Sequence, residues 1–124
     1  MVHGLGHMIS VIKDLHHGYT NALMMMPVER FNVVACPERF KEIGDAMGLD
    51  VRHLNAVQAA DETLEAIERL RNDLGIPQAP LKQFNFTEED VEHAAKWVMN
   101  DISREANPRR IDAEQVKEIL RSCI

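Results

Sequence analysis

The sequence predicts an all-α fold, and three observations lead to this class. Apolar residues recur at intervals of three and four along most of the chain, which is the period of an amphipathic helix. Glycine, proline and capping residues stand where these stretches begin and end. The one run with strand character, FNVVAC, is short and is flanked by helix signals. With 124 residues, the chain is expected to form one domain with its own core.

The first two helices are expected near residues 2–15 and 20–33. Gly18, at the end of HHG, is expected to stop the first helix, because glycine accepts the positive φ that helix C-termini favour. The second stretch contains LMMMPVERF, in which Pro27 has no N–H to donate. We therefore expect a kink or a fresh helix start at Pro27.

Two further helices are expected near residues 37–47 and 52–74. Pro37 suits the first position of a helix, and Gly48 follows the last apolar residue of that stretch. The longer helix carries an apolar residue at every third or fourth position, and Gly75 stops it.

The last two helices, near residues 88–101 and 113–122, have clearly marked starts. In FTEEDV, Thr87 is the expected N-cap, with an acidic residue three positions later and apolar residues placed for a hydrophobic staple. IDAEQV repeats the pattern with Asp112 as the N-cap. The core is expected to draw on apolar residues of the later five helices, namely Leu23, Phe31, Phe40, Ile43, Leu64, Ile67, Leu70, Val91, Trp97, Val98, Ile119 and Leu120.

Charge and composition exclude several classes of function. The formal net charge of −6 argues against nucleic acid or an acidic membrane surface as a partner. No apolar run approaches the roughly 18 to 20 residues of a spanning helix. Cys36 and Cys123 form no CxxC motif, which favours a reduced, cytoplasmic setting.

Histidines are concentrated at the start of the chain, where VHGLGHMISVIKDLHHG holds four of the six. His3 and His7 are four apart, so a helix would place both on one side, near enough to bind one metal or one substrate. His17 follows His3 by 14 residues, which is roughly 21 Å along a straight helix. It can therefore approach His3 and His7 only if the chain turns back. The alternative is that these histidines cap helices or lie on the surface; His53 and His93 are expected to be solvated.

A longer pattern around these histidines resembles a known family. The stretch HGLGHMISVIKDLHHGYTNALMMMPVERFN is similar to the signature HxxAHxxGxxxxxxHGxxNAxxLPxVxxFN of the iron-containing alcohol dehydrogenases. PERFKEIGDAMG, LRNDLGIP and NPRRIDAEQVKEIL resemble segments that close its propanediol dehydrogenase and lactaldehyde reductase branch. The resemblance thus covers essentially the whole chain and implies the C-terminal helical domain of a dehydroquinate synthase-like fold.

The resemblance also implies roles for individual residues. His3 and His17 match metal-binding histidines of the family, whose metal is Fe²⁺, with Zn²⁺ as the alternative. His7 matches a histidine that faces the substrate without being a main ligand. A divalent metal lowers the pKa of a bound alcohol, and a neighbouring histidine can carry its proton away. Asn21 and Pro27 match positions that shape the second helix, so their expected role is structural.

Three positions depart from the family pattern without removing a ligand. Gly6 stands where alanine is usual, and Ser10 stands where glycine is usual and could crowd a helix contact. His16 replaces the proline that commonly precedes the third histidine, and it adds an imidazole that could compete for metal or face solvent.

Other parts of the family's machinery are expected outside this chain. The family's nicotinamide-binding domain and two further metal ligands lie upstream of the matched region, and no GGGS-type loop occurs here. Residues 1–124 are therefore expected to be a C-terminal fragment that binds NAD(P) mainly through an N-terminal domain or an upstream chain. With half a ligand set, it should bind zinc or nickel more readily than ferrous iron.

The expected loss of upstream helices has a further consequence. Leu5, Ile9, Leu23 and the Met24–Met26 run should be partly uncovered, which would favour a homo-oligomer joined through the N-terminal third. The alternative to a dehydrogenase part is a stand-alone helical remnant, or a self-associating module, without redox activity.

Overall fold

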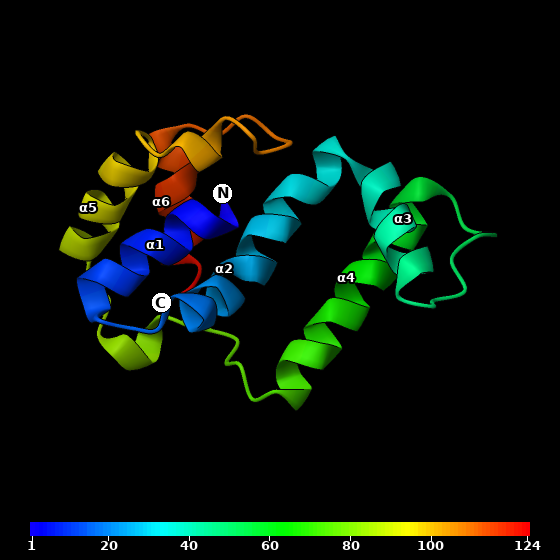
Figure 1. The fold of residues 1–124 in the computed structure, drawn as a ribbon, viewed down its shortest axis with the longest axis horizontal. Helices are drawn as coiled ribbons and strands as arrows, with labels where there is room; N and C mark the ends of the chain where they lie inside the picture. The colour runs from blue at the N-terminus through cyan, green and yellow to red at the C-terminus, as the bar shows by residue number, and fades with distance from the viewer.

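The computed structural model describes residues 1–124 and contains six α-helices and no strand, which confirms the all-α class (Figure 1). The helices are α1 (Val2–Lys13), α2 (His17–Asn32), α3 (Pro37–Ala46), α4 (Ala56–Asp73), α5 (Glu88–Val98) and α6 (Ala113–Arg121). Three short 3-10 turns join them: η1 (Val33–Ala35), η2 (Lys82–Phe84) and η3 (Ile102–Arg104). None of the helices has both the length and the apolar composition needed to cross a bilayer.

Most of the predicted helix boundaries have the expected cause. Thr87 and Asp112 cap α5 and α6 in full capping boxes. Gly48 and Gly75 have positive φ after α3 and α4, as expected of residues that end helices. The predicted start of α4 at residue 52 is four positions too early, because Asn55 forms a third capping box with Gln58.

The predicted end of the first helix is wrong. The residue with left-handed backbone angles is Asp14, at φ 50° and ψ 49°, and Gly18 lies inside α2. Aspartate tolerates this region better than most residues, so the chain can reverse direction there. Ser10 reinforces the reversal, since its Oγ donates to the carbonyl oxygen of Leu15 over 2.6 Å. Pro27 is accommodated within α2, and no new helix begins there.

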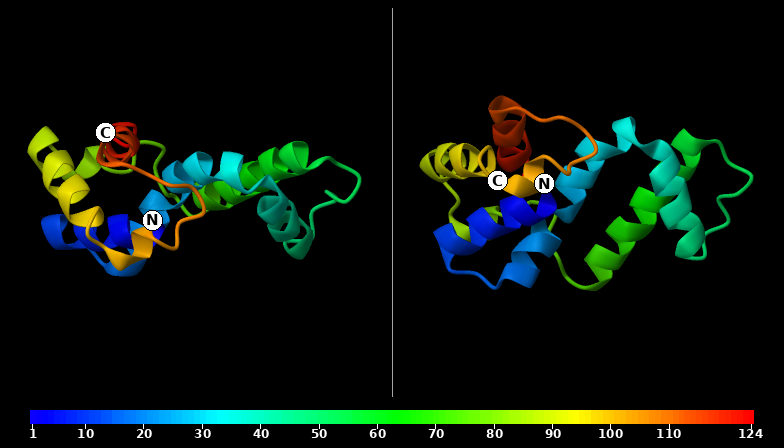
Figure 2. Two further views of the ribbon diagram at one scale, coloured as in Figure 1. Left: turned by 90° about the horizontal axis from the view of Figure 1, so that it is seen from above. Right: turned by 45° about the horizontal axis from the view of Figure 1, so that its top comes forward.

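The helices form two regions (Figures 1 and 2). The body consists of α1, α2, α5 and α6, which enclose a core of 16 buried residues that includes Leu5, Ile9 and Leu120. The hairpin consists of α3 and α4, which pack on each other, and α4 also packs on one side of α2. Its core has four buried residues, namely Met26 of α2 with Phe40, Ala60 and Leu64.

Seven of the twelve predicted core residues are buried: Leu23, Phe40, Leu64, Val91, Val98, Ile119 and Leu120. Phe31 and Ile67 are partly buried. Ile43, Leu70 and Trp97 are exposed, so their prediction is wrong. On α5 the inward face carries Val91, Ala94, Ala95 and Val98, which turns Trp97 toward solvent.

The expected uncovered surface in the N-terminal third is also wrong. Leu5, Ile9, Leu23, Met24 and Met26 are all buried. The body covers Leu5, Ile9 and Met24 within its own core, and the hairpin covers Met26. Only Met25 of the predicted set is exposed.

Candidate metal centre

The turn between α1 and α2 brings the histidines of the two helices together. After the reversal at Asp14, His16 caps α2, with its Nδ1 accepting from the N–H of Gly18 over 3.2 Å. Thr20 then ties the start of α2 to α1, because its Oγ1 donates to the carbonyl oxygen of Gly6 over 2.8 Å. This contact fixes the first turn of α2, which carries His17, against the middle of α1.

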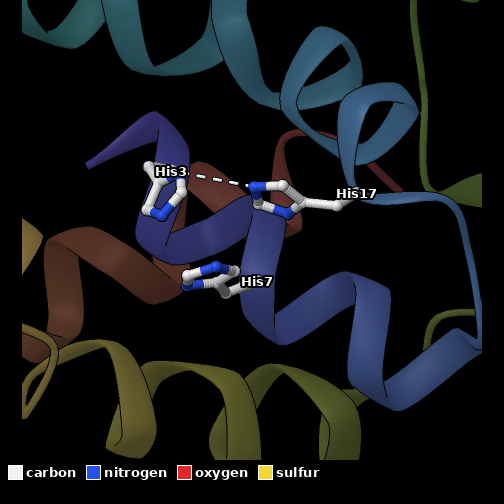
Figure 3. A group of neighbouring side chains, drawn as sticks. All are labelled: His3, His7 and His17. Atoms are coloured by element: carbon white, nitrogen blue, oxygen red, sulfur yellow. Dashed lines mark hydrogen bonds between the residues drawn. The ribbon is translucent and has the colours of Figure 1, made fainter.

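Three imidazoles converge at this place (Figure 3). His3 and His7 extend from successive turns of α1, and His17 extends toward them from α2. One nitrogen of each ring lies within 4.8 Å of one nitrogen of each of the other two. His3 Nδ1 and His17 Nε2 are only 3.3 Å apart. The structure therefore brings all three histidines together: helical spacing places His7 beside His3, and the reversal between α1 and α2 adds His17.

Burial and charge keep His17 in the form that binds metals. Partial burial lowers the pKa of His17, and neighbouring His7, His3 and His16 lower it further. A neutral imidazole has a free lone pair, whereas a protonated one has none. The buried Nδ1 atom of His17 also has no hydrogen-bond partner. An imidazole trio of this kind suits zinc, iron, nickel or copper.

Asn21, for which the sequence indicates only a structural role, is in direct contact with one of the histidines. Its Nδ2 lies 3.0 Å from His17 Nε2, one helical turn away. Gly6 makes room for this amide, because a Cβ at Gly6 would overlap Asn21 Oδ1. The close approach of Gly6 and Asn21 joins two positions of the family pattern, the glycine found here in place of alanine and the asparagine after the third histidine.

Asp101 is a site residue that the sequence does not reveal. It belongs to the segment between α5 and η3, yet its Oδ2 lies 3.7 Å from His7 Nδ1. Nothing in NDISREANPRR indicates proximity to a histidine 94 positions earlier. His53 and His93 are exposed, as expected, and neither belongs to the group of converging histidines.

A comparison with known proteins decides the family. The model for "Fe-containing alcohol dehydrogenase family, C-terminal" matches residues 1–124, the whole chain. The chain belongs to this family.

Relatives within the Fe-containing alcohol dehydrogenase family agree with the branch expected from the sequence. The chain is similar to a 1,3-propanediol dehydrogenase of Klebsiella pneumoniae, with 33% identity over 97% of this chain and 31% of the relative. It is also similar to a lactaldehyde reductase of Escherichia coli strain K12, with 29% identity over 96% of this chain and 31% of that protein. The chain thus spans about a third of the length of these relatives.

The fold agrees with a solved structure of the same family. A crystal structure of 1,3-propanediol oxidoreductase superimposes with a TM-score of 0.91 and 32% sequence identity. The superposition covers 99% of this chain and 32% of the other. The predicted C-terminal helical domain architecture is therefore confirmed.

Proposed function

We propose that this chain supplies part of the metal centre of an iron-dependent, NAD(P)-linked alcohol dehydrogenase. His3 and His17 are the proposed metal ligands, and His7 is the proposed catalytic histidine. The observation that carries this proposal is the convergence of the three rings, whose nitrogens lie within 4.8 Å of one another. Two of these residues are 14 positions apart, so the proximity depends on the fold rather than on helical spacing.

The three side chains suit different tasks in this reaction. A divalent ion held there would lower the pKa of an alcohol substrate, which favours proton loss near neutral pH. His7 is half exposed, so it can accept a proton on one side and release it to water on the other. His17, half-buried and held neutral, is better suited to donating a lone pair.

The rest of the enzyme is proposed to come from outside residues 1–124. We propose that these residues form the C-terminal helical domain, and that the main NAD(P) site lies in an N-terminal domain or a separate upstream chain. The names of the two relatives favour short alcohols or diols and their aldehydes as substrates.

Metal titration followed by calorimetry tests the ligand assignment. The two proposed ligands, His3 and His17, with His7 beside them, should bind Zn²⁺ or Ni²⁺ weakly, and Fe²⁺ more weakly still. We expect His3→Ala and His17→Ala each to reduce zinc affinity by about tenfold or more, which equals about 1.4 kcal/mol. His93→Ala, an exposed histidine on α5, is the matched control and should bind as the unsubstituted chain does.

Two results would contradict this assignment. Unchanged zinc affinity in His3→Ala and His17→Ala would exclude them as ligands. Stoichiometric, sub-micromolar Fe²⁺ binding that His3→Ala abolishes would instead mean that this chain carries a complete site.

The isolated chain is expected to be inactive as a dehydrogenase. Without a nicotinamide site there is no acceptor for the hydride. NAD reduction with 1,3-propanediol should therefore be undetectable for residues 1–124 alone. Steady reduction that His17→Ala abolishes would overturn this expectation.

A stand-alone helical module is the second candidate. The body core supports it, because Leu5 and Ile9 are fully covered by the chain's own helices. The proposed contacts for self-association are exposed apolar side chains such as Leu70 and Trp97, because most of the apolar residues expected to be uncovered in the N-terminal third are buried. Light scattering at high concentration tests it, and a strictly monomeric species would contradict it.

A further inference from the structure

The segment that carries Asp101 is held firmly against the helices that carry the histidines. Asn107 and Asn32 exchange two amide hydrogen bonds, of 3.1 and 2.8 Å. Arg109 donates to the carbonyl oxygen of Phe31 over 2.9 Å, and its guanidinium lies 3.9 Å from the centre of the Phe31 ring. The loop after α5 is therefore fixed to the C-terminal end of α2.

A glycine on α1 lets the other end of this segment approach the histidine helix. Gly4 is buried between His3 and His7 in sequence, and a Cβ there would lie 2.7 Å from Ser103 Oγ and 3.4 Å from Asp101 Cγ. Such a Cβ would be too close to Ser103 for ordinary packing. The absence of a side chain at Gly4 thus allows Asp101 to reach the same end of α1 as the imidazoles.

The two oxygens of Asp101 have different partners. Oδ1 accepts from the backbone N–H of Ser103 over 2.7 Å, which caps η3. Oδ2 faces His7 Nδ1 at 3.7 Å. Hydrogen bonding from Ser103, together with the nearby His7, holds the pKa of Asp101 below its usual value. The group is therefore a carboxylate, which can only accept hydrogen bonds.

We propose that Asp101 is a positioning residue for His7, whose Nδ1–H it holds so that Nε2 keeps its lone pair. A carboxylate behind a histidine fixes both the tautomer and the orientation of the ring. The observed 3.7 Å needs to shorten by less than about 1 Å to become a hydrogen bond, and such contacts are often long before substrate binds. The consequence for catalysis rests on the proposed function, whereas the effect of Asp101 on the His7 tautomer does not.

If Asp101 had a purely structural role, that role would be to cap η3 and nothing more. Asparagine is as good an N-cap as aspartate, so Asp101→Asn preserves the bond to Ser103 N–H. With Oδ1 still accepting from Ser103, the carboxylate oxygen that faces His7 is replaced by the amide –NH2, which donates hydrogen bonds and accepts none. This substitution therefore separates capping from histidine positioning.

The test is nitrogen NMR of the imidazoles in the metal-free full chain, at a pH where they are neutral. We expect His7 to be protonated mainly at Nδ1, and Asp101→Asn and Asp101→Ala each to shift its tautomer ratio toward Nε2–H by about tenfold. Glu105→Gln is the matched control, because Glu105 is exposed on the same segment and is bonded to none of the three histidines. It removes the same charge and should leave the His7 ratio unchanged.

Each other outcome overturns the proposal. If His7 is protonated mainly at Nε2 in the unsubstituted chain, or keeps its ratio in Asp101→Asn, Asp101 does not hold Nδ1. If Glu105→Gln shifts the ratio equally, the effect is one of general charge. Because no metal is present, a failure here is distinguishable from a failure of the zinc titration, which tests the ligand assignment alone.

Discussion

The body and the hairpin are both helical, but they differ in how they are stabilised. The body encloses 16 buried residues contributed by four helices and by the segments between them. The hairpin has four, one of which it takes from α2. Exposed apolar side chains occur in both regions, for example Leu70 in the hairpin and Val11 in the body, so the difference lies in the buried clusters. The hairpin therefore depends on α2, whereas the body can close its core without the hairpin.

The candidate metal centre lies entirely on the better packed region. His3, His7 and His17 come from α1 and α2, and Asp101 comes from the segment after α5. A site that needs imidazoles placed within a few tenths of an ångström benefits from helices whose inner faces are fully packed. The difference between the regions suggests that core substitutions in the body will affect stability and metal binding together, whereas substitutions in the hairpin will affect stability alone.

The largest expected effect is that of Leu5→Ala. Leu5 is fully buried in the body core, between the turns of α1 that carry His3 and His7. Leucine-to-alanine changes at such positions cost about 3 to 5 kcal/mol of unfolding free energy. We expect a loss in this range by urea denaturation, accompanied by weaker zinc binding.

Leu64→Ala is the matched change in the hairpin. Leu64 is 4% exposed and belongs to the four-residue cluster, so its neighbours can partly collapse into the space it leaves. We expect a loss of about 2 kcal/mol, the lower end of the range for such changes, with zinc affinity unchanged. Equal effects of the two substitutions on zinc affinity would break the distinction between the regions.

Two buried glycines provide a second, smaller contrast. A Cβ at Gly44 in the hairpin would overlap the Thr63 side chain, which is buried and donates to the carbonyl oxygens of Phe40 and Ala59. A Cβ at Gly6 would overlap Oδ1 and Cγ of Asn21, whose side chain is longer than that of Thr63 and can rotate. We expect Gly44→Ala to cost about 1 to 3 kcal/mol through overpacking.

Gly6→Ala should change stability less but should affect the histidines more. Rotation of the Asn21 amide would remove its 3.0 Å contact with His17 Nε2, which a shifted His17 resonance would report. Thermal unfolding of both variants measures the stability difference. A Gly6→Ala chain that is less stable than Gly44→Ala would show that Asn21 is held as rigidly as Thr63.

The fold class could be predicted from the sequence because its signals are local. Thr87, Asp112 and Gly75 determine helix ends through hydrogen bonds and backbone angles within a few residues. The turn at Asp14 was not predictable in this way. A glycine four positions later was the stronger local signal, and the reversal depends on contacts between α1 and α2.

Residues of the candidate site also differ in whether signals within the sequence predict their place. His3 and His7 are near each other on any helix, and the family pattern adds His17. Asp101 could not be found, because its place depends on a loop held to α2 by Asn107 and on the space beside Gly4. The exposure of Trp97 was missed for a related reason, since helical periodicity shows that a face is apolar but not which residue lies at its edge.

The smallest expected effects concern one ion pair in each region. In the body, Lys13 Nζ lies 2.6 Å from Asp90 Oδ2, and their side chains are 19% and 18% exposed. In the hairpin, Arg52 Nε lies 2.6 Å from Asp45 Oδ1, and their side chains are 82% and 43% exposed. Burial alone would raise the pKa of Asp90, but hydrogen bonds from Lys13 and Thr87 bring it below its usual value. Hydrogen bonding from Arg52 lowers the pKa of Asp45.

A carboxyl whose pKa is lower in the folded state stabilises the fold above its unfolded pKa, and this stabilisation is lost as the pH falls through the folded value. We therefore expect Asp90→Asn to cost about 1 kcal/mol at pH 7 and progressively less below about pH 4. Asp45→Asn should have no measurable effect in high salt, because water and ions screen an exposed pair. Urea denaturation of both variants from pH 7 to pH 2 measures the difference. If Asp45→Asn lost as much stability as Asp90→Asn, partial burial would not explain the strength of the Lys13–Asp90 ion pair.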